Sequence, residues 1–395
     1  MLLCPDCLSL RATAEPCPRD GATPLDYATA LVGRRLGPWL LRAKVSEGGM
    51  AIVYAAEHEQ LGRLAAIKVL RPELSLREPL VARFLQEARA VSLIGHKNIV
   101  TVYDFGRAPG DTSYIVMEYL HGATLRELID GRRALPLERL AAIVEQVGQA
   151  LAAAHDKGFV HCDVKPENIV VDDSGARPAV KLLDFGIATL LSADASDLGA
   201  PTAVGTAPYM APEQLAQGPV DARTDVYALG VLTYELLTGR HPFPGQTPLA
   251  CVGSRPSGPP RPPSRERTDL SSAVATGVDA VVLHALALAP EQRYAGARPF
   301  LAALQHALGS AAASAAGGGV GAPRALARRL ARRRRGRGPA PGARGGPARP
   351  GLAATPRGLA GQRLRPARAA TARPTRSEGR RASPRPRRRP SSLPP

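Results

Sequence analysis

One stretch of the chain, from His161 to Asn168, combines an acid, a cation and an amide, and a second acid follows at Asp184. Moving a phosphoryl group from a nucleotide to a hydroxyl mainly requires that the reactants are positioned and that charge on the transferring oxygens is neutralised. Mg²⁺ prefers oxygen ligands, usually one or two carboxylates together with phosphate oxygens. The stretch therefore predicts that Asp163 accepts a hydroxyl proton, that Lys165 contacts the moving phosphate, and that Asn168 and Asp184 bind Mg²⁺.

The spacing between Asn168 and Asp184 predicts how these two ligands meet. Two apolar runs, at 169–171 and 180–183, are separated by a turn-forming segment at 172–175. Short apolar runs around such a turn are typical of a β-hairpin. A hairpin here would hold Asn168 and Asp184 near each other.

These residues resemble the catalytic loop and the metal-binding Asp-Phe-Gly triplet of eukaryotic-type Ser/Thr protein kinases, known in bacteria as Hanks-type kinases. The lysine two residues after the catalytic aspartate is the signal of the Ser/Thr class in that family. The resemblance implies an α+β chain with the two-lobed protein kinase fold, in which a small β-rich N-lobe precedes a larger helical C-lobe. It also implies ATP and Mg²⁺ as cofactors and proteins as substrates.

The segment 37–70 is similar to the strands and the glycine-rich loop with which kinases cover the phosphates of ATP. Glycines in such a loop let the backbone approach phosphates and turn its N–H groups toward them. Only Gly48 keeps a family glycine, because Ser46 and Ala51 stand at the first and third glycine positions. The loop residues that the resemblance implies for ATP binding are Val45, Ser46, Glu47, Gly48, Gly49, Met50, Ala51, Ile52 and Val53.

Lys68 follows the apolar residues 65–67, so its stem is expected to run along a buried strand face, where its charge either snorkels to water or pairs with an acid. Residues 80–94 carry apolar side chains at helical spacing. Glu87 stands in this predicted helix where the family carries the partner of the lysine. The resemblance implies a Lys68–Glu87 ion pair that directs Lys68 to the α- and β-phosphates.

The strands predicted at 100–105 and 114–117 lead into a segment at 118–122 that resembles the hinge between kinase lobes. By that resemblance Met117 lies at the back of the adenine pocket, and the backbone of Glu118 and Leu120 binds the adenine edge. The apolar residues that would enclose the base, each also compatible with a plain core role, are Val45, Val53, Ala66 and Val170.

A helix predicted at 137–157 leads into the catalytic loop, where Cys162 replaces the arginine of most such kinases. In those relatives the arginine binds a phosphorylated activation loop, so its absence argues against that form of control. Thr206 belongs to a segment that resembles the substrate-docking loop. Asp225 resembles the family aspartate that caps the catalytic-loop backbone, and Arg293 matches the arginine that pairs with Glu213.

The start of the chain contains two short Cys-Pro loops. They supply Cys4, Cys7 and Cys17, and Asp20 occupies the place of a fourth cysteine. Structural zinc sites are tetrahedral with nitrogen or sulfur ligands, and a carboxylate is permitted but unusual. Segment 1–25 is therefore either a zinc-ribbon-like Zn²⁺ site or a metal-free remnant of one, with a redox role or a chance grouping of cysteines as the remaining readings.

The positive charge of the chain is concentrated at one end. From Gly321 to Pro395 there are 22 arginines, one glutamate and no lysine, whereas the whole chain has a net charge of +18. Segment 309–395 has few bulky apolar residues, which predicts a disordered tail. Its arginines would attract a polyanion. Two alternatives are a solvated tail without a specific partner and a stretch of reading frame whose protein sequence has not been selected for any function. The predicted linker at 26–36 and the predicted kinase domain at 37–308 precede this tail.

Two function classes follow from these motifs. The first is an active Ser/Thr kinase, and the second is a pseudokinase that binds nucleotide and partners, motivated by Ser46, Ala51 and Cys162. No apolar run is long enough to predict a membrane span. Five cysteines in 395 residues, without a secretory leader, predict the cytoplasm.

Overall fold

The computed structural model describes residues 2–4, 6–7, 9–108, 112–130, 134–185, 207–243, 245 and 258–317. Thr206 and the predicted polyanion-binding segment at 321–395 lie outside these residues. The strands are β1 Leu2–Leu3, β2 Leu10–Arg11, β3 Leu25–Asp26, β4 Arg35–Leu36, β5 Trp39–Glu47, β6 Ala51–His58, β7 Leu64–Leu70, β8 Val102–Ala108, β9 Thr112–Glu118, β10 Ala123–Thr124, β11 Ile169–Asp172 and β12 Ala179–Leu182. The helices are α1 Tyr27–Ala30, α2 Pro72–Ser75, α3 Glu78–Ile94, α4 Leu125–Ile129, α5 Leu137–His155, α7 Pro212–Leu215, α8 Ala222–Thr238, α10 Pro263–Glu266, α11 Ser272–Ala285 and α12 Ala297–Gly317, with 3₁₀ turns η1 Pro166–Asn168 and η4 Pro290–Gln292.

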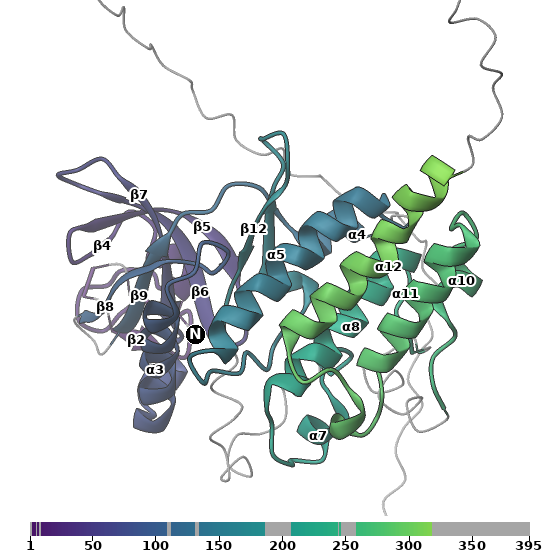
Figure 1. The fold of residues 1–395 in the computed structure, drawn as a ribbon. Coiled ribbons are helices and arrows are strands. Elements are labelled where there is room, and N and C mark those ends of the chain that lie inside the picture. Colours follow the sequence, from purple (N-terminus) through teal and green to yellow (C-terminus); the bar gives the residue numbers. More distant parts are fainter. Residues whose placement is uncertain are drawn as a thin grey trace, which may run out of the picture. The chain divides into compact units, whose positions relative to one another are not determined.

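Six antiparallel strands form the sheet that carries Lys68, in the order β4-β5-β6-β7-β9-β8 (Figure 1). Successive side chains of a strand point to opposite faces. Ile67 and Val69 accordingly lie fully buried in one cluster of the sheet, and Lys68 points to the other face. The register places Lys68 opposite Val53 of β6 and Ile115 of β9.

Helix α3 packs against the face of the sheet that carries Lys68. Its residues Val81, Phe84 and Ala88 share one buried cluster with Leu70 and Ile115. A helix was predicted at 80–94, and the structure confirms it. Its apolar stripe determines which side faces the sheet, and this orientation brings Glu87, one helical turn from Phe84, to Lys68.

Segment 26–36 differs from the predicted linker. Tyr27, Ala28 and Leu31 are buried in the same cluster as the sheet residue Tyr54, and the Tyr54 hydroxyl donates to the Ala28 carbonyl at 2.9 Å. The segment folds against the sheet because its apolar side chains cover apolar side chains of the sheet that would otherwise be exposed. Its short elements gave no periodicity that sequence inspection could detect.

The hairpin predicted around 172–175 is present as β11 and β12. The helices α5, α8, α11 and α12 pack against one another, as Figure 1 shows. Helix α8 is buried on nearly all sides, which suits its mostly apolar sequence. Within the residues that the structure describes, no helix is sufficiently long and apolar to cross a membrane.

Helix α12 runs further than the sequence predicted. The kinase domain was predicted to end at residue 308 and the disordered tail to begin at residue 309, but α12 continues to Gly317. Segment 311–316 is almost entirely alanine, the residue with the highest intrinsic helix propensity. The helix propensity of these alanines therefore extends α12 through a segment that has no apolar periodicity.

The predicted Arg293–Glu213 pair is present and buried. The Arg293 Nη1 and Nη2 atoms donate to the Glu213 carboxylate at 2.8 and 2.9 Å, and the two side chains are 0% and 9% exposed. Arg293→Ala would leave the Glu213 charge buried, so we expect the free energy of unfolding to fall by about 3–5 kcal/mol. Urea denaturation measures this loss.

The matched control is Arg298→Ala. Arg298 also pairs with a carboxylate, Asp156, but both side chains are at least half exposed. Because exposed pairs are worth about 1 kcal/mol or less, this variant should unfold nearly as the unmodified protein does. Equal losses in the two variants would contradict the structural role of Arg293.

Candidate active site

Two donors hold the carboxylate of Asp163. The Lys165 Nζ atom donates to its two oxygens at 3.0 and 2.8 Å. The Asn168 amide nitrogen donates to the Asp163 Oδ2 atom at 2.8 Å and to the Asp163 carbonyl at 2.9 Å. Because that nitrogen is committed to Asp163, the amide oxygen of Asn168 is the atom suited to a metal ion.

The hairpin β11–β12 joins Asn168 to the segment that carries Asp184. The Leu183 N–H donates to the Asn168 carbonyl at 2.8 Å, so the residue before Asp184 is tied to the residue that precedes β11. Asp184 itself has φ 31°, a backbone conformation that non-glycine residues adopt at a cost. The structure thus brings together the four residues predicted for catalysis and Mg²⁺ binding.

Lys68 contacts two acids. Its Nζ atom lies 3.2 Å from the Glu87 Oε1 atom and 2.9 Å from the Asp184 Oδ1 atom. The Lys68 and Glu87 side chains are each 10% exposed, whereas Asp184 keeps 42% exposure. The predicted Lys68–Glu87 pair is therefore present, and through Lys68 it is linked to Asp184, which remains accessible from solvent.

Burial and charge act in opposite directions on these three groups. Burial alone would lower the pKa of Lys68, but the charges of Asp184 and Glu87 outweigh it and raise that pKa. Burial raises the pKa of Glu87 to about 7, against the opposing charge of Lys68. For Asp184 the charge of Lys68 outweighs burial and lowers the pKa, so Asp184 is ionised at neutral pH, as a metal ligand must be.

The loop between β5 and β6 accommodates both departures from the glycine pattern. Ser46 pairs with Val53 in the ladder, and the Gly48 N–H donates to the Ala51 carbonyl at 2.9 Å. None of Ser46, Gly48 and Ala51 is among the described residues with positive φ. Serine and alanine therefore fit this backbone without strain, which weakens the motive for the pseudokinase alternative.

The hinge segment is anchored at Glu118. Its N–H donates to the Thr101 carbonyl at 2.9 Å, and its carboxylate accepts from the Lys181 Nζ atom at 2.5 Å. The Glu118 carbonyl, not its N–H, is therefore the group suited to an adenine edge. The segment ends at Gly122, which has φ 106°. Only glycine fits at this position, because a Cβ atom would lie 2.2 Å from the Val171 carbonyl oxygen.

Comparison with known proteins agrees with this geometry. Residues 39–302 match the model of the protein kinase domain. This chain belongs to the protein kinase family. It is 44% identical over 279 residues to the serine/threonine-protein kinase Pkn1 of Myxococcus xanthus, covering 70% of this chain and 39% of that relative. It is 42% identical over 250 residues to PknB of Mycobacterium leprae, covering 62% and 39%.

The fold also matches solved kinase structures. The crystal structure of the M. tuberculosis PknI kinase domain aligns with a TM-score of 0.55 and 29% identity, covering 70% of this chain and 98% of that one. The present chain spans about 39% of the length of the curated relatives Pkn1 and PknB.

Asp225, at the start of α8, holds the backbone of the kinase catalytic loop. Its fully buried carboxylate accepts from the His161 and Cys162 N–H groups at 2.8 Å each, and it lies 2.8 Å from the His155 Nε2 atom. Asp225→Asn replaces an acceptor with a donor, so we expect the free energy of unfolding to fall by roughly 1.5–3 kcal/mol and phosphoryl transfer to weaken.

Urea denaturation and a phosphorylation assay measure both effects. Asp269→Asn is the control, because the Asp269 side chain is 69% exposed and pairs only with Arg267 among the contacts seen. If Asp225→Asn unfolds and phosphorylates as Asp269→Asn does, Asp225 does not support the loop.

Cys162, at the position of the family arginine, is 5% exposed and has φ 64°. Burial, reinforced by the charges of Asp225 and Asp163, raises the pKa of its thiol. The thiol is therefore protonated at neutral pH, and only the thiolate is a reactive nucleophile. Cys162 acts as a packed small residue in the kinase loop.

Sequence inspection missed one cluster beside the catalytic loop. Arg126 of α4 donates to Glu167 at 2.8 Å, to Glu235 at 3.1 Å and to the Tyr209 hydroxyl at 2.5 Å. These residues come from four separate segments, so no local spacing connects them. One indication of this cluster was present in the sequence, because Glu167 lies within the recognised catalytic-loop motif.

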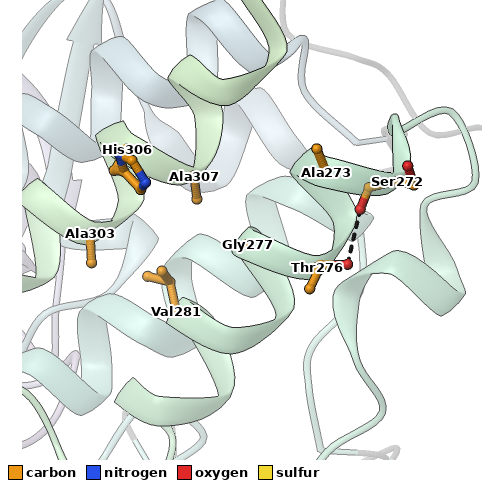
Figure 2. Close-up of a pocket in the computed structure, with 8 residues that line it drawn as sticks. All are labelled: Ser272, Ala273, Thr276, Gly277, Val281, Ala303, His306 and Ala307. Carbon is orange, nitrogen blue, oxygen red and sulfur yellow. Dashed lines mark hydrogen bonds between the residues drawn. The ribbon is translucent and has the colours of Figure 1, made fainter. Parts of the chain in front are cut away.

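A groove of about 640 Å³ lies away from the catalytic cluster, between α11 and α12 (Figure 2). Gly277 of α11 and Ala307 of α12 are among the residues that line it. A Cβ atom at Gly277 would meet the Ala307 Cβ atom at 2.9 Å. The groove lining contains none of the predicted ATP-binding or catalytic residues.

Proposed function

We propose that this chain is a serine/threonine protein kinase that transfers the γ-phosphoryl group of ATP to Ser or Thr hydroxyls of proteins, itself included. The observation that supports this most directly is the pair of contacts that Lys165 and Asn168 make to Asp163. Relatives named serine/threonine-protein kinases, at 42% and 44% identity, support the same class.

In this proposal Asp163 accepts the proton of the substrate hydroxyl. Its carboxylate is oriented by Asn168, and the adjacent Lys165 ammonium lies where negative charge on the transferring phosphoryl oxygens needs a cation. Lys165 needs no movement to reach Asp163, because the two side chains are already in contact. We propose that the segment that includes Thr206, which lies outside the described residues, docks the substrate.

The ligand set fits Mg²⁺. The amide oxygen of Asn168 and the carboxylate of Asp184 are hard oxygen donors, and phosphate oxygens would complete the coordination. When bound, Mg²⁺ neutralises charge on the β- and γ-phosphates. Lys68, oriented by Glu87, would pair with the α- and β-phosphates once ATP displaces its contact with Asp184.

The adenine ring would lie between the sheet and β11. Ala66 of β7 and Val170 of β11 are proposed to enclose it with Val45 and Val53. Met117 closes the back, and the backbone of Glu118 and Leu120 reads the edge. Residues 45–53 would cover the phosphates from the β5–β6 side.

The test is phosphoamino acid analysis after incubation of the full chain with labelled ATP, Mg²⁺ and a generic basic protein. We expect label on Ser and Thr of the substrate and of the chain itself. Label confined to Tyr would contradict the proposed class. No label from a folded, nucleotide-binding chain would support a pseudokinase instead.

Three finer proposals accompany the kinase. A cytoplasmic location is supported by the free thiols Cys4, Cys7, Cys17 and Cys162 among the described residues. Polyanion contact through 321–395 rests on arginine content alone. Zinc at the N-terminal cysteines is a separate proposal that does not bear on phosphoryl transfer.

A further inference from the structure

Two loops near the N-terminus have the same hydrogen-bond pattern. The Cys4 N–H donates to the Ser9 carbonyl at 3.0 Å, and the Cys17 N–H donates to the Ala22 carbonyl at 2.9 Å. Each bond closes a loop between a cysteine and the residue five positions later. The two loops are therefore equivalent in this closing bond, although their sequences share little beyond the initial Cys-Pro.

The equivalence of the loops places Cys7 and Asp20 at matching positions. Each is the third residue after the first cysteine of its loop. One ligand atom from each of Cys4, Cys7, Cys17 and Asp20 lies within 4.8 Å of all the others. The Cys7 and Cys17 sulfurs are 3.5 Å apart, and the Cys4 sulfur is 3.3 Å from either Asp20 oxygen.

These separations are close to the edges of a zinc tetrahedron. With a Zn–S bond of about 2.3 Å, two sulfurs around one ion lie about 3.8 Å apart. A disulfide is not what the arrangement shows, because its sulfurs would be about 2.05 Å apart, and all three cysteines are free. Small side-chain movements would place the four atoms around one ion.

We propose that Cys4, Cys7, Cys17 and Asp20 form a structural Zn²⁺ site. Binding releases the thiol protons to solvent and leaves three thiolates and one carboxylate on the metal. Cys4 and Cys17 are buried, whereas Asp20 is exposed. The carboxylate is therefore the ligand that opens first, and the ion is more readily removed than from a site of four cysteines.

The site is attached to the sheet that carries Lys68. Leu3, next to Cys4, is 4% exposed and belongs to the cluster that also contains Tyr27, Trp39 and Tyr54. The ion would hold in place the strand β1 that supplies Leu3 to this cluster. Zinc binding should therefore stabilise the β-rich lobe as well as the N-terminal loops.

The test measures zinc bound to the full chain under reducing conditions, after chelation and titration with Zn²⁺ alone. We expect about one Zn²⁺ per chain and a rise in melting temperature on addition of Zn²⁺. Co²⁺ in place of Zn²⁺ should give the intense visible absorption of a tetrahedral thiolate site. Cys17→Ser should lose the bound zinc and the thermal shift, while Cys162→Ser keeps both.

Two milder variants keep the proposal testable if Cys17→Ser fails to fold. Asp20→Asn changes an exposed residue and should speed the loss of zinc to a chelator, whereas Asp20→Cys should slow it. The proposal is overturned if the reduced chain binds no Zn²⁺, or if Asp20→Asn and Asp20→Cys release it at the same rate as the unmodified chain.

Discussion

An Asp163→Asn variant is expected to lose phosphoryl transfer by about 10²- to 10⁴-fold, the range that a positioned general base contributes. Asparagine has the same shape, and its amide oxygen can still accept from Lys165 or Asn168. It lacks the negative charge that takes up the hydroxyl proton. The rate of label transfer from ATP to a Ser/Thr substrate measures the loss, and a fluorescent nucleotide should bind with unchanged affinity.

The control makes the same chemical change outside the site. Asp173 lies in the turn between β11 and β12 and pairs with Arg139. Asp173→Asn should transfer phosphate at the rate of the unmodified chain. If Asp163→Asn retains that rate as well, another group accepts the proton and the proposed mechanism is wrong.

Lys68→Met is expected to reduce phosphoryl transfer by roughly 10²- to 10³-fold, as loss of one preorganised charge-stabilising donor does in other active sites. Methionine fills the space of the lysine stem without its charge. Glu87 is then buried without a cation, so the free energy of unfolding should fall by about 3 kcal/mol. Kinase assays and urea denaturation measure the two losses separately.

A double variant separates stability from catalysis. Lys68→Met with Glu87→Leu removes the uncompensated acid, so stability should recover while activity stays low. Lys97→Met, which changes an exposed lysine, controls for the substitution itself. Recovery of activity in the double variant would mean that Lys68 acts only by stabilising the fold.

Much of the kinase site could be predicted because its residues are close in the chain. Asp163, Lys165 and Asn168 lie within one loop, and the short hairpin that joins Asn168 to Asp184 has a turn that local spacing reveals. Helices α3 and α5 could be predicted because their apolar periodicity is strong. The sequence did not reveal the packed segment 26–36, because the side chains it covers belong to distant strands.

By itself, the sequence determined which chemical groups are present and which of them lie on the same local element. The tertiary structure decided which groups meet across elements: Lys68 with Asp184, and Arg126 with Glu235. Local spacing determines neighbours on one helix or strand, but contacts between elements depend on how apolar faces pack. That packing also determines which charges are buried, and therefore how their pKa values shift.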